Sequence, residues 1–148
     1  MEVIKHKILG YIPHVTPQFE IIFQNCSFTN NSLLRDKKDT FVGAIVNIFS
    51  MERVTFKDCN FTRNNNTALS LVDSNLVLEG DILFDNNHAI NGGALRFCDT
   101  SLVYIRNNTH IKFYNNHAKN ASGAIYAQQQ CLDTAPACRG MVWHLLQS

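Results

Sequence analysis

The sequence predicts an all-β protein, a parallel β-helix (solenoid) of about four rungs with three short strands per rung. The first observation is a phrase, Phe followed three residues later by Asn, which occurs as "FTNN" (28–31), "FTRN" (61–64), "FDNN" (84–87) and "FYNN" (113–116). Each copy precedes a small residue and an aliphatic one, in "VGAI" (42–45), "NTAL" (66–69), "GGAL" (92–95) and "SGAI" (122–125). The steps of 33, 23 and 29 residues between the Phe residues vary too much for helical hairpins, but they suit a coil with constant strands and variable corners.

The second observation is the apolar spacing inside each repeat. Leu69 and Leu71, then Leu76 and Leu78, fall at every second position, which is the period of a strand. The matching segments are "ALSLV" (68–72) with "ALRFC" (94–98) and "NLVLEG" (75–80) with "SLVYIR" (101–106), both at an offset of 26, and "DILFDNN" (81–87) with "HIKFYNN" (110–116) at 29, where the corner "NNT" (107–109) is extra. Each strand is therefore expected to pair with its equivalent one rung away, roughly 4.8 Å above or below.

These elements divide the chain into three parts. Residues 19–128 form the predicted β-helix, and residues 1–18, with Pro13 and Pro17, form an irregular N-terminal segment or cap. Residues 129–148 form a C-terminal counterpart in which Trp143 could belong to a short covering segment. Solenoids need such caps because open parallel edges invite further pairing. Four rungs is a short coil and no export signal is present, so we expect a piece of a longer repeat protein.

The repeated phrase has a chemical interpretation as a joint between strands. Phe and the Asn three residues later lie on opposite faces of a straight strand, so a bend between them is needed to turn both inward. The rings would then stack from rung to rung, and the amides would form a ladder along the same axis. The glycines mark a close approach of backbone. The predicted ladder residues are Phe28, Phe61, Phe84 and Phe113, with Asn31, Asn64, Asn87, Asn116, Gly93 and Gly123.

Composition excludes several classes of protein. The chain of 148 residues is one domain by length, 17% of it is charged, and its net charge is +1. No basic run predicts nucleic acid as a partner, no apolar run is long enough to span a membrane, and no motif predicts a cofactor. The sequence leaves the oligomeric state open.

Asparagine usage favours a secreted or cell-surface location. Six Asn-x-Ser/Thr sequons are about three times the chance number for 17 Asn and 17 Ser or Thr. The candidate glycosylation sites are Asn25, Asn30, Asn60, Asn65, Asn107 and Asn120. The alternative is that Asn-rich turns beside Thr create sequons by accident.

The cysteines favour the same location. Cys26 and Cys59 occupy matching phrases, two residues before a ladder Phe, so adjacent rungs would place them within reach of a disulfide. A pair of stacked thiols is the alternative. Cys131 and Cys138 are seven residues apart, and a disulfide could close that loop. Cys98 is expected to be a buried thiol, and the chain has no Cys-x-x-Cys pair for zinc or redox chemistry.

The complete copy of the signature, Phe84, Asn87, Gly92–Gly93, Ala94 and Leu95, resembles the polymorphic outer membrane protein repeat. That repeat belongs to bacterial autotransporter adhesins and to β-helix-rich extracellular proteins of other organisms. The resemblance covers about residues 19–127, although the other three copies have degraded glycine halves. It implies a right-handed parallel β-helix with a surface or adhesive role and carries no catalytic residues. A eukaryotic extracellular relative is equally compatible with it.

Reactive side chains offer little support for chemistry. His88 and His117 follow the Asn pair at equivalent positions, where a solvated ladder is expected rather than a metal site, because Asp81 and Asp85 have no counterparts in the next rung. The alternative to a scaffold or adhesion module is a lyase or glycosidase acting on polysaccharide, which needs carboxylates gathered on one face. We expect no enzyme and no catalytic residue, and an unidentified protein or glycan as the partner.

Overall fold

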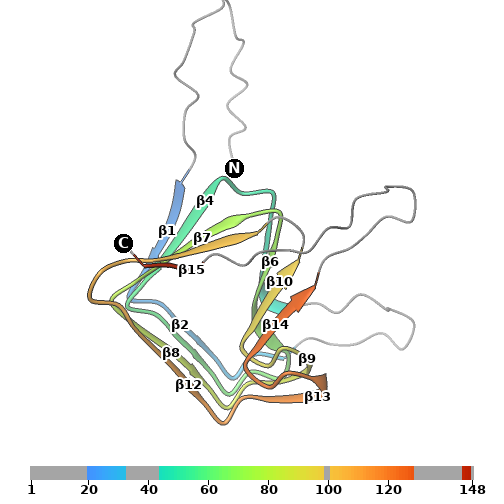
Figure 1. Ribbon diagram of the computed structural model, residues 1–148. Helices are drawn as coiled ribbons and strands as arrows, with labels where there is room; N and C mark the ends of the chain where they lie inside the picture. The colour runs from blue at the N-terminus through green and yellow to red at the C-terminus, as the bar shows by residue number, and fades with distance from the viewer. Residues whose placement is uncertain (1–19, 33–43, 99–100, 129–144, 148) are drawn as a thin grey trace, which may run out of the picture.

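The protein is a parallel β-helix in a computed structural model that describes residues 20–32, 44–98, 101–128 and 145–147 (Figure 1). The strands are β1 (Glu20–Gln24), β2 (Ser27–Thr29), β3 (Ala44–Phe49), β4 (Arg53–Lys57), β5 (Asn60–Thr62), β6 (Thr67–Val72), β7 (Asn75–Glu79), β8 (Asp81–Asp85), β9 (His88–Asn91), β10 (Leu95–Cys98), β11 (Leu102–Ile105), β12 (His110–Tyr114), β13 (His117–Ala121), β14 (Ile125–Gln128) and β15 (Leu145–Gln147). In this part of the chain no helix is long and apolar enough to cross a membrane.

Three parallel sheets form the walls of the coil, as the sequence predicts. The first sheet has the order β1-β4-β7-β11-β15, the second β12-β8-β5-β2 and the third β14-β10-β6-β3. Figure 1 shows the strands of each sheet lying one behind another along the coil. A short fourth sheet, β13-β9, is added at the corner between the second and third sheets in the last two rungs. The four rungs therefore begin at β1, β4, β7 and β11, and β15 pairs with β11 at the start of a further turn.

The strand register confirms most of the repeat alignment and corrects two parts of it. Leu95 pairs with Leu69 and Phe113 with Phe84, at the predicted offsets of 26 and 29. In the first sheet, however, Val103 pairs with Leu76, an offset of 27 rather than 26. A shift of one residue exchanges the two faces of a strand. The observed register turns Val103 inward and leaves Leu102 exposed, and the Ser101 hydroxyl fixes it by accepting a hydrogen bond from the backbone N–H of Ser74 (3.3 Å).

The second correction concerns β3. The segment "VGAI" aligns Ile45 with Leu69 by its sequence, but the structure pairs Val46 with Leu69 and Ala44 with Thr67. This register turns Val46 and Ile48 toward the core. It also places the buried Ala44 at the position where backbones of adjacent later rungs come close together. The small residue of the first repeat is therefore Ala44 rather than Gly43.

Stacked aromatic rings fill the core beside the second sheet. The centroids of Phe28 and Phe61 are 4.9 Å apart, those of Phe61 and Phe84 4.8 Å, and those of Phe84 and Phe113 5.2 Å, with nearly parallel planes. Phe56 meets Phe61 edge-on at 5.3 Å. The predicted Phe ladder is present, and its two middle rings are fully buried. Aromatic pairs of this geometry add to the stability that comes from burial alone.

The predicted asparagine ladder runs beside the rings. Asn31, Asn64 and Asn87 each donate Nδ2–H to the Oδ1 of the next Asn, at 3.1, 2.8 and 2.8 Å, and the column ends at Asn116. The backbone N–H of Asn64 also donates to the Asn87 Oδ1 at 3.2 Å. A second Nδ2 proton of Asn87 goes to the carbonyl of Phe61 at 2.9 Å. Every polar atom of the buried Asn87 amide therefore has a partner, which is the condition for burying it without a large penalty.

Left-handed residues make the bend that turns both ladders inward. Asn30, Arg63, Asn86 and Asn115 stand between the ladder Phe and the ladder Asn of their rungs, with φ between 49° and 57°. Asn tolerates this region because its short side chain bonds locally, whereas other residues with a Cβ are strained there. Three of the four corners thus use a favoured residue, and Arg63 is the exception.

Gly93 and Gly123 are confirmed as points of close approach. A Cβ on Gly93 would lie 2.4 Å from the carbonyl oxygen of Gly123 and 2.8 Å from that of His117. A Cβ on Gly123 would lie 2.5 Å from the carbonyl oxygen of Asn116. These distances are shorter than van der Waals contact, so backbone packing between the last rungs requires glycine. Thr67 holds the equivalent place one rung earlier and donates its hydroxyl to the Asn91 carbonyl at 3.0 Å.

The predicted segments at the two ends fall largely outside the described residues. Residues 1–18 lie there entirely, and of residues 129–148 only β15 is described. The strands of the coil run from Glu20 to Gln128, close to the predicted range of 19–128.

Candidate binding surface on the outside of the coil

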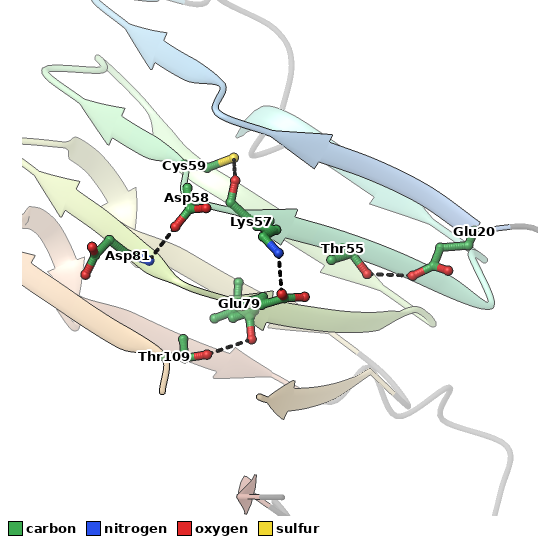
Figure 2. Close-up of polar contacts among 9 residues, drawn as sticks. Glu20, Thr55, Lys57, Asp58, Cys59, Glu79, Asp81 and Thr109 are labelled. Atoms are coloured by element: carbon green, nitrogen blue, oxygen red, sulfur yellow. Dashed lines mark hydrogen bonds and ion pairs between the residues drawn. The ribbon is translucent and has the colours of Figure 1, made fainter. Parts of the chain in front are cut away.

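The outer face of the first sheet carries charged side chains that pair with one another (Figure 2). Lys57 Nζ lies 2.6 Å from Glu79 Oε1, and this contact, first as a hydrogen bond and then as a charge interaction, raises the pKa of the Lys57 ammonium. One rung toward the N-terminus, the Thr55 hydroxyl donates to Glu20 Oε1 at 2.8 Å. Both contacts join neighbouring rungs. The charges of Lys57 and Glu79 offset each other, so this part of the face serves the stacking of strands better than it serves a ligand.

An acidic corner joins the first sheet to the second. Asp58 Oδ1 accepts a hydrogen bond from the backbone N–H of Asp81 at 3.0 Å, and Figure 2 shows the two residues next to each other. Gly80 stands beside them with φ +70°, and a Cβ there would lie 2.0 Å from Asp58 Oδ1. The Asp81 carboxylate faces His110 Nδ1 at 3.5 Å in an exposed contact. The Asp58 carboxylate thus supports the corner, as an Asn or Asp does in many turns.

A second corner, between the second sheet and the short fourth sheet, carries a different set of side chains. Two rows of outward positions cross the four rungs here and define what we call the corner ridge: Asn30, Arg63, Asn86 and Asn115 in one row, and Ser32, Asn65, His88 and His117 in the other. None of these eight residues is acidic. The ridge lies directly outside the buried asparagine ladder, so the ladder fixes the spacing of its side chains.

A shallow hollow of about 470 Å³ lies on the corner ridge. Its walls are Arg63, Asn64, Asn65, Asn86 and His88. Arg63 and His88 are exposed, and within the described residues the Arg63 guanidinium forms no ion pair. A cation beside several amides is able to bind an acidic or hydroxyl-rich group, because it donates hydrogen bonds in a fixed planar fork.

The two histidines lie side by side at one edge of the ridge, as predicted, but their rings are tilted rather than stacked. His88 and His117 pair in the short fourth sheet, with ring centroids 6.0 Å apart and planes tilted by 49°. His88 Nδ1 lies 3.2 Å from the Asn86 carbonyl oxygen, so this nitrogen carries the proton and Nε2 remains for another contact. Among the described residues, no group of three or more His, Cys, Asp or Glu side chains is placed to hold a metal ion.

The row of the second sheet that includes Asp85 shows whether carboxylates gather on one face, as a polysaccharide-acting enzyme would need. Thr62 pairs with Thr29 on one side and with Asp85 on the other, and Tyr114 pairs with Asp85. Asp85 is thus the one carboxylate in a row of four, and it accepts a hydrogen bond from Asn86 Nδ2 at 3.0 Å. On the third sheet Arg96 likewise stands between Ser70 and Tyr126, and its Nε donates to the Ser70 hydroxyl at 3.1 Å.

All six sequon asparagines are exposed, whereas the three asparagines buried in the described part of the chain, Asn64, Asn66 and Asn87, start no sequon. The exposed sequon residues are Asn25, Asn30, Asn60, Asn65, Asn107 and Asn120. Asn30 and Asn65 lie on the corner ridge. The sequon asparagines thus present their side chains to solvent, including Asn25 and Asn30, whose backbone makes bends of the coil.

Cys26 and Cys59 occupy equivalent places in adjacent rungs, but both are free thiols rather than the expected disulfide. Each sulfur donates to backbone instead. Cys59 Sγ lies 3.2 Å from the Lys57 carbonyl oxygen and 3.3 Å from that of Phe23, and Cys26 Sγ lies 3.4 Å from that of Gln24. Burial raises the pKa of the Cys59 thiol. Cys98 is buried, as predicted, and Cys131 and Cys138 lie outside the described residues.

An apolar hollow of about 330 Å³ opens at the C-terminal end of the coil. Its walls include Val103, Ile105, Ile111 and Phe113, which face inward from the fourth rung. In the earlier rungs the same space is filled by the side chains of the next rung. The hollow is therefore the continuation of the core.

Arg63 is the functional candidate that the sequence interpretation missed. The third residue of the repeated phrase is Asn in "FTNN", "FDNN" and "FYNN" but Arg in "FTRN". The replacement of Asn by Arg at an otherwise constant position was the sequence feature that could have identified this candidate. Its relevance to binding becomes clear only because the structure places Arg63 at a left-handed bend on the outer surface.

Comparison with known proteins supports the architecture. A search of curated proteins and a search of solved structures found no match for the sequence. A protein-family model described as the right-handed β-helix region matches residues 11–134, which is most of the chain and includes all four rungs. With its parallel sheets and stacked repeats, the chain belongs to the right-handed β-helix family.

Proposed function

We propose that the chain is an extracellular or cell-surface β-helix module, part of a longer repeat protein, that acts as a scaffold and binds a protein or glycan through its outer surface. The observation that carries the proposal is the corner ridge. Its polar side chains cross four rungs at the spacing of the ladder beneath them, and Arg63 and His88 flank a hollow there. Solenoids bind through such extended, regularly spaced surfaces.

The accessibility of the sequons supports the location. All six sequon asparagines are exposed, so folding leaves each of them open to solvent. The resemblance of Phe84–Leu95 to the polymorphic outer membrane protein repeat supports a surface role as well, since that repeat occurs in adhesins. A structural solenoid of the cytosol with accidental sequons is the competing interpretation of the same sequence.

The alternative to a binding scaffold is an enzyme with the same fold, a polysaccharide lyase or glycosidase. It would need acid–base groups arranged across rungs. Asp58, Asp81 and Glu79 come from neighbouring rungs at the acidic corner, which is the observation in its favour. Asp58 is engaged by backbone and Glu79 by Lys57, so neither is held ready for proton transfer to a substrate.

The location is tested by expressing the full chain through a eukaryotic secretory pathway. We expect a mass increase that a deglycosidase removes, and its partial loss when Asn60 or Asn107 is changed to Gln. The matched control is Asn108→Gln, because Asn108 is exposed beside Asn107 but starts no sequon. A secreted chain that carries no glycan at any of the six sites would contradict the proposal.

The enzymatic alternative is tested with the same protein. Incubation with polygalacturonate and Ca²⁺, followed for unsaturated products and for new reducing ends, should show no turnover. Turnover that disappears in Asp85→Asn or Asp81→Asn would replace the scaffold proposal with the enzyme.

A further inference from the structure

We infer that the hollow at Arg63 binds an acidic sugar unit, one that carries a carboxylate or sulfate group beside free hydroxyls. The inference rests on the proposed function, since it names the ligand class of that same surface. It is argued from the charge of the ridge, the strained backbone of Arg63, and the hydrogen-bonding groups around the hollow.

Charge is distributed unevenly over the outside of the coil. The acidic side chains of the first sheet and its corner, Asp58, Glu79 and Asp81, lie on a different flank from the corner ridge. The ridge has one guanidinium, two imidazoles, amides and a hydroxyl, and no carboxylate. The Asp85 carboxylate accepts a hydrogen bond from the amide of Asn86, a wall of the hollow, and does not itself line the hollow. Among the walls of the hollow, Arg63 is therefore the permanently charged side chain, and it is a cation.

The backbone at Arg63 is strained in a position where the fold itself prefers another residue. Its φ is +55°, and the other three rungs place Asn at this bend. The bend at residue 63 therefore does not need an arginine for its conformation. Strained residues of this kind cluster at binding sites, where the side chain has a use that outweighs the backbone cost. Arg63 reaches solvent at the hollow without a partner in the described part of the chain, which is where such a use would lie.

The groups around Arg63 suit a sugar better than a bare anion. A guanidinium binds a carboxylate or sulfate through two parallel N–H donors. Around it, the exposed amide of Asn65, the amide of Asn86 and the imidazole of His88 offer donors and acceptors in the same hollow. Sugar hydroxyls need both kinds of group, whereas an isolated phosphate needs donors alone. The hollow is also open and polar, unlike the apolar pockets that bind aromatic or aliphatic ligands.

The test uses the full chain made without N-glycans, because Asn65 is both a sequon residue and a wall of the hollow. Titration calorimetry with a heparin tetrasaccharide and with tetragalacturonate should show binding, and maltotetraose, which has no acidic group, should show none. Arg63→Asn supplies the residue that the other rungs use and keeps the fold. We expect it to weaken binding about tenfold or more, as loss of a charge-assisted bidentate contact does. Arg63→Lys should lose most of the affinity as well, since a lysine lacks the planar fork.

The matched control is Arg106→Asn, which removes the same charge from an exposed residue outside the ridge. It should change the affinity less than twofold. An equal loss in Arg63→Asn and Arg106→Asn would mean that net charge alone drives binding, and the inference would be overturned. Stronger binding to phosphatidylserine vesicles or to inorganic phosphate than to either acidic oligosaccharide would also overturn it.

Failure of this site and failure of the proposed function give different results. The same proteins are tested for attachment to immobilised extracellular matrix. If wild type and Arg63→Asn attach equally while neither binds the acidic oligosaccharides, the site is refuted and the scaffold function stands. If the wild type binds neither the matrix nor the oligosaccharides, both are refuted.

Discussion

The asparagine ladder makes a strong prediction about Asn87, whose side chain is fully buried in the third rung. Asn87→Ala removes the two Nδ2 donations, to the Phe61 carbonyl (2.9 Å) and to Asn116 Oδ1 (2.8 Å). It also removes the Oδ1 that accepts from Asn64 Nδ2 (2.8 Å) and from the Asn64 backbone N–H (3.2 Å). The substitution therefore breaks four hydrogen bonds inside the coil.

The cost comes from the groups that remain. One Nδ2 proton and the backbone N–H of the buried Asn64 would each lose their acceptor, and the Phe61 carbonyl would lose the Asn87 donor. One unsatisfied buried group costs about 1–3 kcal/mol. Some relaxation and water entry will lower the sum, so we expect Asn87→Ala to reduce the free energy of unfolding by about 3–5 kcal/mol. This is a large share of the stability of a domain of this size.

Urea unfolding followed by circular dichroism measures the loss, with midpoint and slope fitted separately because decoupled rungs would lower the slope. Asn65→Ala is the matched control: Asn65 is exposed in the same corner, and among the described residues its side chain forms one hydrogen bond, to Ser32 at 3.5 Å. It should change stability by less than about 0.5 kcal/mol. If Asn87→Ala costs no more than this control, the ladder does not hold the rungs together and the reasoning is wrong.

Three further predictions concern the packing of the rungs and the thiols. Gly93→Ala should destabilise the fold by about 1–3 kcal/mol in the same assay, because its Cβ would lie 2.4 Å from the Gly123 carbonyl oxygen; an unchanged midpoint would contradict the close approach. Phe61→Ala should cost about 3–5 kcal/mol through the cavity it leaves between stacked rings, and a loss near 1 kcal/mol would mean that the coil collapses onto the gap. Iodoacetamide at pH 8 should alkylate Cys26 well before Cys59, because Cys59 is fully buried and burial raises its pKa, so that little thiolate forms; equal rates by peptide mass spectrometry would argue against that burial.

The parts of the fold that repeat could be predicted from the sequence. The Phe and Asn ladders follow from a four-residue phrase whose first and last residues cannot share a face of a straight strand. A bend between them was therefore required, and it turns both the Phe and the Asn side chain into the core. The register of β8 with β12 was predicted because the extra corner residues, 107–109, are visibly polar. Periodic burial leaves a strong trace in a sequence because every rung must satisfy it.

The remaining features depend on how neighbouring segments pack in three dimensions, which the sequence of one segment does not reveal. The offset of 27 between β7 and β11 arises because the corner before Leu102 takes an additional residue, and "NLVLEG" aligns well with its partner either way. The thiols of Cys26 and Cys59 donate to the carbonyls of Gln24 and Lys57, the last residues of β1 and β4, and a matching phrase cannot show where a sulfur points. Arg63 departs from the pattern by one residue, and only the surface it occupies gives the departure a role.

The ladder also gives the coil an electrical direction. Asn31, Asn64 and Asn87 all donate toward the later rung, so their amide dipoles point the same way along the axis and polarise one another. In the four described rungs the column therefore has an acceptor end at Asn31 and a donor end at Asn116. Two such columns can join only head to tail, because reversing one would bring donors against donors. Addition of a rung, from whatever source, thus has a fixed polarity that the apolar core alone would not impose.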